Sequence, residues 1–272
     1  MKIVRIPQKL IRLLRAIWQD RRLLSALSQQ DFKRRFAGSY FGTLWGFVNP
    51  LLTMTVYWVV FQFGFRSGDV GEIPFLLWFM CGIVAWLFFS EAFSMASNSF
   101  LEYGYLVKKV VFNIDILPMV KILSCLYVHL FFIVLLAVVC CLMGYFPSLY
   151  WLQLPYYLLC TICLLFALTL VFASVNVFFR DLNQIISIIL LIGMWGTPIA
   201  WSAQMFSEKA QMFFKLNPIY YLVEGYRDCF VQKIWFWQKY HQMEYFWALI
   251  LLLMMAGTFV FDRLRNSFAD FI

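Results

Sequence analysis

No Asp, Glu, Lys or Arg occurs from Ile122 through Phe179. A helix rises about 1.5 Å per residue and a bilayer core is about 30 Å thick, so this stretch accommodates two crossings of about 20 residues each. Hydrophobic residues make up 63% of the chain and charged residues 13%. The sequence therefore predicts an all-α integral membrane protein. It excludes a secreted disulfide scaffold and, despite the net charge of +8, a nucleic-acid-binding domain.

The gaps between charged residues predict six transmembrane helices within residues 37–272. Their approximate bounds are 44–65, 73–93, 121–143, 156–179, 182–203 and 245–261. Residues 202–244, between the fifth and sixth spans, are too charged to cross the membrane and too apolar to lie in water. Short re-entrant or outer-leaflet helices are predicted there, in an external segment whose backbone other protein covers.

Residues 1–36 carry ten Lys and Arg among apolar positions at helical spacing, and they hold no apolar run long enough for a signal peptide. This pattern predicts an amphipathic helix in the interface plane, with its basic side chains toward anionic lipid headgroups. The alternative is a soluble amphipathic helix packed on another protein.

The distribution of Lys and Arg orients the predicted spans. With the N-terminus inside, the cytoplasmic side carries sixteen basic residues and the other side carries six. Because cytoplasmic loops carry the excess of basic residues, both termini are predicted to be cytoplasmic. In this orientation Cys229 is predicted to be accessible from outside, whereas Cys125 and Cys140 are not. The segment 98–118 is then cytoplasmic. It is predicted either to form a short amphipathic helix that docks on a soluble partner or to be a plain connector.

Catalytic and metal-binding motifs are absent from the sequence. It contains no G-x-x-x-x-G-K-[ST], H-E-x-x-H or G-x-S-x-G pattern, and its two histidines stand apart. We therefore predict no enzyme, no metal site and no cofactor in this chain. His129 lies in the middle of a span and is predicted to be neutral and hydrogen-bonded to a neighbouring helix.

Glycines and aromatic residues mark the first and fifth spans. Gly38, Gly42 and Gly46 would form one smooth stripe on a helix, suited to packing within the chain or to a dimer contact. Aromatic rings gather at the outer half of the first span and around Pro198 in the fifth. Such rings stack on sugars, but they also form membrane belts and cores.

Several motifs together resemble the membrane subunits of polysaccharide and polyol-phosphate ABC exporters. They are DFKRRF at 31–36, GSYFGTLW at 38–45, Asn49-Pro50, Leu216-Asn217-Pro218 and Tyr226-Arg227. The resemblance covers essentially the whole chain. It is strongest to the O-antigen type, and capsule and teichoic acid exporters are related.

The resemblance implies a half-transporter in the bacterial inner membrane. Two copies of this chain would join two copies of a separate ATPase, which binds ATP and Mg²⁺, and would move a lipid-diphosphate-linked glycan outward. Residues 1–36 and 98–118 would contact the ATPase, and residues 202–244 would form an external gate.

The resemblance also implies roles for individual residues. The aromatic lining of the sugar path would be Tyr57, Trp58, Phe61, Trp195 and Trp201. Contacts to the lipid diphosphate would come from Arg34, Arg35 and Tyr40. The residues that dock on the ATPase would be Tyr103, Lys108, Lys109, Asn113 and Asp115. The external gate would contain Asn217, Pro218, Tyr221, Glu224 and Arg227.

Two functions of other classes remain open at this level: an ATP-independent secondary carrier and a lipid-modifying membrane enzyme. A carrier is expected to show an internal repeat with polar breaks at mid-membrane. No such repeat relates residues 44–143 to 156–261.

Overall fold

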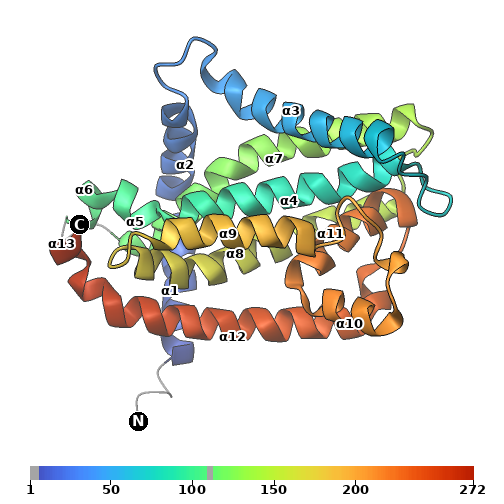
Figure 1. The fold of residues 1–272 in the computed structure, drawn as a ribbon. Coiled ribbons are helices and arrows are strands. Elements are labelled where there is room, and N and C mark those ends of the chain that lie inside the picture. The colour runs from blue at the N-terminus through green and yellow to red at the C-terminus, as the bar shows by residue number, and fades with distance from the viewer. Residues whose placement is uncertain (1–5, 109–112) are drawn as a thin grey trace.

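The computed structural model describes residues 6–108 and 113–272, which are mostly helical, as the sequence predicts (Figure 1). The long helices are α3 (Trp45–Val59), α4 (Phe75–Ser97), α7 (Leu117–Leu142), α8 (Leu154–Asn176), α9 (Leu182–Gly196) and α12 (Tyr240–Leu264). The shorter ones are α1 (Ile6–Gln19), α2 (Arg21–Arg35), α5 (Ser99–Glu102), α6 (Gly104–Val107), α10 (Glu208–Leu216), α11 (Pro218–Arg227) and α13 (Phe268–Phe271). Wider π turns at Val60–Gly64 and Asp228–Gln232 extend α3 and α11.

Five helical segments of the described residues are long and apolar enough to cross a membrane. They are Gly42–Gly64, Phe75–Ser97, Ile114–Leu142, Leu149–Asn176 and Phe236–Ser267, and they overlap the predicted first, second, third, fourth and sixth spans. The last of them extends beyond the predicted 245–261 at both ends.

The predicted fifth span differs from the structure, because α9 ends at Gly196 rather than near residue 203. Its 15 residues make about 22 Å of helix, less than the hydrocarbon thickness. The cause is Pro198, which disfavours a helical conformation at the residue before it. Thr197 is accordingly extended, at φ −104° and ψ 133°. The count of six crossings therefore stays a prediction.

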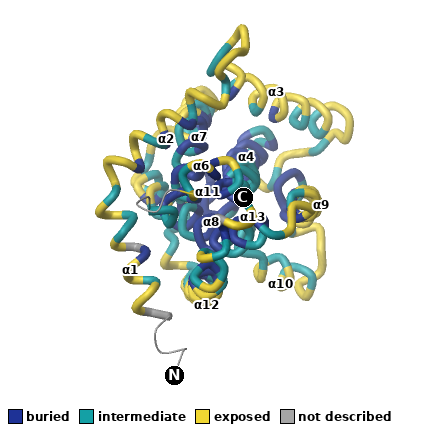
Figure 2. Tube along the Cα trace, turned by 90° about the vertical axis from the view of Figure 1, so that its left-hand side faces the viewer, coloured by how far each residue is buried: buried dark blue, intermediate teal, exposed yellow. Residues whose placement is uncertain are grey.

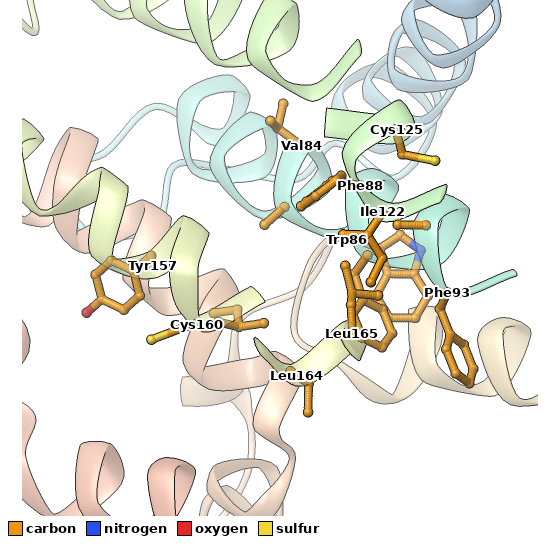
Figure 3. Packing of buried hydrophobic residues seen from close by; sticks show 14 of the residues in the cluster. Val84, Trp86, Phe88, Phe93, Ile122, Cys125, Tyr157, Cys160, Leu164 and Leu165 are labelled. Atoms are coloured by element: carbon orange, nitrogen blue, oxygen red, sulfur yellow. The ribbon is translucent and has the colours of Figure 1, made fainter. Parts of the chain in front are cut away.

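Helix α4 forms the centre of the bundle, where it packs against α7, α8, α9 and α11. Apart from Glu91 and a few serines it is apolar on all sides, as expected for a helix surrounded by others, and Leu77, Phe79 and Ile83 are completely buried. Figure 3 shows part of this core, with side chains of α4, α7 and α8 gathered together. We call the end of the bundle that holds α5, α6 and α13 the α5 end, and the opposite end the α10 end (Figure 1).

Helices α3 and α9 stand at the margin of the bundle, as Figure 2 shows by their exposed colouring. Only 11% of the span that contains α3 is buried, against 78% for α4. Most of the exposed side chains are apolar, among them Leu52 and Val56 on α3 and Ile188 and Ile192 on α9. Such surfaces are suited to lipid or to another apolar protein face.

Helices α1 and α2 run across the bundle near the α5 end, while the long helices run along it (Figure 1). Lys9 of α1 forms an ion pair with Asp262 of α12. Helix α2 packs on α7, where the Ser28 hydroxyl lies 3.1 Å from the Tyr127 hydroxyl. This crosswise arrangement suits helices that lie in the plane of a membrane surface.

Two predictions from the sequence are wrong. Gly38 and Gly42 have positive φ angles of 85° and 52° between α2 and α3, so only Gly46 lies in an α-helix and the three form no stripe. A Cβ on Gly46 would lie 2.7 Å from the Phe36 ring, which packs there. Cys229 is completely buried, because the turn after α11 continues inside the bundle, so it is not accessible from outside.

Candidate functional site

A cleft rich in aromatic side chains opens at the α10 end, with a volume of about 570 Å³. Four segments form it: the end of α3, the loop before α4, the first turn of α4 and the extended segment after α9. We call it the aromatic cleft. Its lining includes Phe61, Phe65, Ser67, Asp69, Phe75, Trp78, Trp201, Ser202 and Gln204.

Three of the five aromatic residues predicted to line a path come together at this cleft. Phe61 and Trp201 line it, and the Trp195 ring lies 6.4 Å from the Phe61 ring. The break at Pro198 turns the chain back, so that the Trp201 indole donates a hydrogen bond of 3.2 Å to the carbonyl of Trp195. Tyr57 and Trp58 lie farther back along α3, half-buried and outside the lining.

The predicted gate residues fix α11 inside the bundle rather than on its surface. Asn217 caps the helix by accepting the Ile219 N–H at 3.0 Å, and its amide donates to the Thr197 hydroxyl at 2.9 Å. Pro218 occupies the first turn, where the absence of an N–H costs nothing. Farther along, the Tyr221 hydroxyl lies 3.0 Å from that of Tyr156 on α8.

Arg227 is completely buried at the end of α11. Its guanidinium donates to the Glu224 carboxylate at 2.6 Å and to the carbonyls of Trp78 and Ile199 at 3.3 and 3.1 Å. It also lies 3.5 Å above the Trp78 ring. A Cβ on Gly82 would come within 2.9 Å of the guanidinium, so a glycine of α4 makes room for it. Arg227 therefore joins α11, α4 and the segment after α9.

Other polar contacts hold the C-terminal end of α11. Burial raises the pKa of Asp228 to about 6, although Lys239, 2.6 Å away, acts in the opposite direction. Tyr226 places its hydroxyl 2.7 Å from Nε2 of His129, which stacks on Phe88. The predicted hydrogen bond between His129 and a neighbouring helix is thus confirmed.

A second, more polar pocket of about 480 Å³ adjoins the aromatic cleft. It shares Trp78, Ser202 and Gln204 with the aromatic cleft. The side chains found only here include Glu72, Tyr220, Glu224 and Gln232. Carboxylates, amides and aromatic rings are the groups that bind sugar hydroxyls and the apolar faces of sugars.

A third pocket of about 320 Å³ lies where the chain passes from α2 into α3. We call it the basic pocket. Its lining includes Arg35, Trp45, Gly46, Asn49, Thr53, Ser90 and Glu91. Among the three predicted diphosphate contacts only Arg35 faces this pocket, where it is ion-paired with Glu91. Arg34 is exposed, and Tyr40 is 98% exposed in the turn that follows.

The predicted docking residues at the α5 end mostly make contacts within the chain. Tyr103 is buried and donates to the Asp31 carboxylate at 2.6 Å, and burial, reinforced by this bond, raises the pKa of Tyr103. Asn113 donates to Asp20 of the α1–α2 turn at 2.9 Å.

The three remaining docking residues differ in what surrounds them. Asp115 lies 3.5 Å from Arg265. Lys108 is exposed and open to a partner. Lys109 lies outside the described residues.

A comparison with protein families gives a match to the ABC-2 type transporters over residues 22–231. The chain belongs to the ABC-2 type transporter family. Three relatives are each named O-antigen export system permease protein RfbA. The one from Myxococcus xanthus is 29% identical over 268 residues, which cover 97% of this chain and 100% of the relative. Two from Klebsiella pneumoniae are 26% and 27% identical, and each covers 92% of this chain and 95% of its own length.

The sequence did not reveal two ionic contacts of this ABC-2 type transporter. Lys121 at the start of α7 is buried and donates to Asp31 of α2 at 2.7 Å, and it also pairs with Glu102 of α5. Glu91, within α4, pairs with Arg35. The sequence feature that could have indicated these contacts is a charged residue beside or inside an apolar span, because such residues require partners.

Proposed function

We propose that the chain is the transmembrane subunit of an ATP-driven exporter that moves a lipid-diphosphate-linked polysaccharide of the O-antigen type across the bacterial inner membrane. The observation that carries the proposal is similarity over 92–97% of the chain to proteins named O-antigen export permeases. Belonging to the ABC-2 type transporters favours a transporter subunit over an enzyme.

The proposal assigns transport and ATP hydrolysis to different subunits. The sequence has no P-loop, so two copies of a separate ATPase, with ATP and Mg²⁺, would supply the energy. The exposed apolar faces of α3 and α9 offer a surface for a second copy of the chain. The charge count favours an orientation with the α5 end and both termini in the cytoplasm. Lys108 and the neighbouring segment 98–118 would then face the ATPase, and the gate segment 202–244 would lie outside.

The aromatic cleft supports a glycan path at the outer end of this subunit. Its rings come from α3, α4 and the segment after α9, and Asp69, Ser67 and Gln204 add polar groups beside them. Rings that stack on sugars one after another contribute about 1 kcal/mol each, which retains a polymer without stopping its movement.

The proposed function is tested by deleting the gene in the native host and by purifying the chain with its ATPase. We expect the deletion to remove the polysaccharide from the cell surface and to leave lipid-linked polymer on the inner face of the membrane. The purified chain alone is expected to hydrolyse no ATP, and the complex with the ATPase is expected to do so. Normal surface polysaccharide in the deletion strain would refute the proposal.

Paired substitutions test the glycan path. Phe61→Ala and Trp201→Ala should each reduce surface polysaccharide mildly, because each removes one of several weak contacts. The double variant should reduce it several-fold at normal protein levels. Phe259→Ala, at an exposed position of α12 outside the cleft, is the matched control. An unchanged surface signal in the double variant would place the path elsewhere.

A further inference from the structure

The basic pocket has one feature that phosphate binding alone does not require. Of the two charged side chains in its lining, Arg35 is a cation and Glu91 is an anion, and they pair with each other. Both are only partly covered, with exposed side-chain fractions of 26% and 23%. An anion from outside can therefore reach the guanidinium without unfolding of the chain.

The position of Glu91 within the membrane span explains why it needs Arg35 as a partner. Glu91 lies six residues before the end of α4, about 9 Å of helix inside its α5 end. A carboxylate inside an apolar span is costly without a cation. Arg35, the last residue of α2, reaches it across the pocket. Polar groups of Asn49, Thr53 and Ser90 also line the space.

We propose that Glu91 is a positioning residue that competes with the diphosphate of the substrate for Arg35. The inference rests on the proposed function. A free guanidinium binds phosphate through paired, charge-assisted hydrogen bonds. With Glu91 in reach, binding exchanges one anion for another, so the gain in free energy is small and the phosphate is released readily. Glu91 thus prevents the substrate from remaining in the basic pocket.

The test uses the complex of this chain with its ATPase in phosphatidylethanolamine vesicles. The probe is a polyprenyl diphosphate that carries N-acetylglucosamine, and the readout is ATP hydrolysis at increasing probe concentration. We expect Glu91→Gln to lower the half-saturating concentration about fivefold, because a partly exposed ion pair has an effect of about that size. The maximal rate should also fall, because the phosphate is released more slowly. Glu91→Asp, which keeps the charge but shortens its reach, should lie between Glu91→Gln and the native chain.

Two further variants show whether Glu91 acts through Arg35. Arg35→Gln should raise the half-saturating concentration, and adding Glu91→Gln to it should change nothing more. Asp270→Asn, an exposed carboxylate on α13, is the control and should match the native chain. A shift by Glu91→Gln that persists without Arg35, or an unchanged half-saturating concentration, would overturn the inference.

A second titration, with phosphatidylglycerol in place of the probe, distinguishes the diphosphate of the substrate from the phosphate of a lipid headgroup. The same shift with this lipid would assign the pocket to bulk headgroups and overturn the role in substrate release. Failure of the probe to stimulate the native complex would instead count against the proposed function itself. A shift confined to the diphosphate probe supports the inference.

Discussion

Replacing Arg227 with methionine is expected to remove most of the folded protein. The substitution leaves the Glu224 carboxylate without its cation and takes the donors from the carbonyls of Trp78 and Ile199. Breaking a buried ion pair on one side costs about 3–5 kcal/mol, a large part of the stability of most proteins. The yield of monodisperse protein after detergent extraction and its thermal midpoint measure the effect.

The control for Arg227 is Lys209→Met, which removes a basic residue from the exposed surface of α10. It should leave the yield within experimental error. Arg227→Lys should still be strongly destabilising, because an ammonium group lacks the planar fork that reaches three acceptors at once. A normal yield for Arg227→Met would show that the buried contacts of this side chain do not hold α11 in place.

The position of the membrane-crossing helices was largely predictable from charge, because burying a charge in hydrocarbon is costly and spans therefore lie between charged residues. At Pro198 the charge pattern does not locate the end of the helix. A proline within an apolar run either kinks a helix or ends it, and the sequence does not distinguish the two. Here the helix ends at Gly196, and the break brings Trp201 back toward Trp195.

Other parts of the site were not predictable, for identifiable physical reasons. Glycine adopts both helical and positive φ angles, so the spacing of Gly38, Gly42 and Gly46 fitted a helical stripe that does not exist. Arg227 and Lys121 were counted among the basic residues that orient the chain. Each is in fact buried against carboxylates, and their partners on other elements depend on tertiary packing that the sequence pattern does not encode.

Lys121→Met is expected to have the second large effect, at the α5 end. Lys121 is 3% exposed and joins Asp31 of α2 to Glu102 of α5, while Tyr103 donates to the same Asp31 oxygen. Without the ammonium group the buried Asp31 carboxylate loses its cation, which costs about 3–5 kcal/mol. We expect a low yield of folded protein and weak retention of the ATPase on the purified chain.

A second substitution shows that the lost charge balance, rather than lost packing, causes this effect. Asp31→Asn removes the uncompensated charge and still accepts the hydrogen bond from Tyr103, so it should restore most of the yield when combined with Lys121→Met. Arg263→Met, an exposed basic residue near the end of α12, should behave like the native chain. If the double variant is no more stable than Lys121→Met, packing of the lysine stem holds α2 and α5 to α7. If the double variant regains stability but still does not retain the ATPase, the ion pairs of Lys121 themselves fix the docking surface. A stable fold would then be insufficient for ATPase binding.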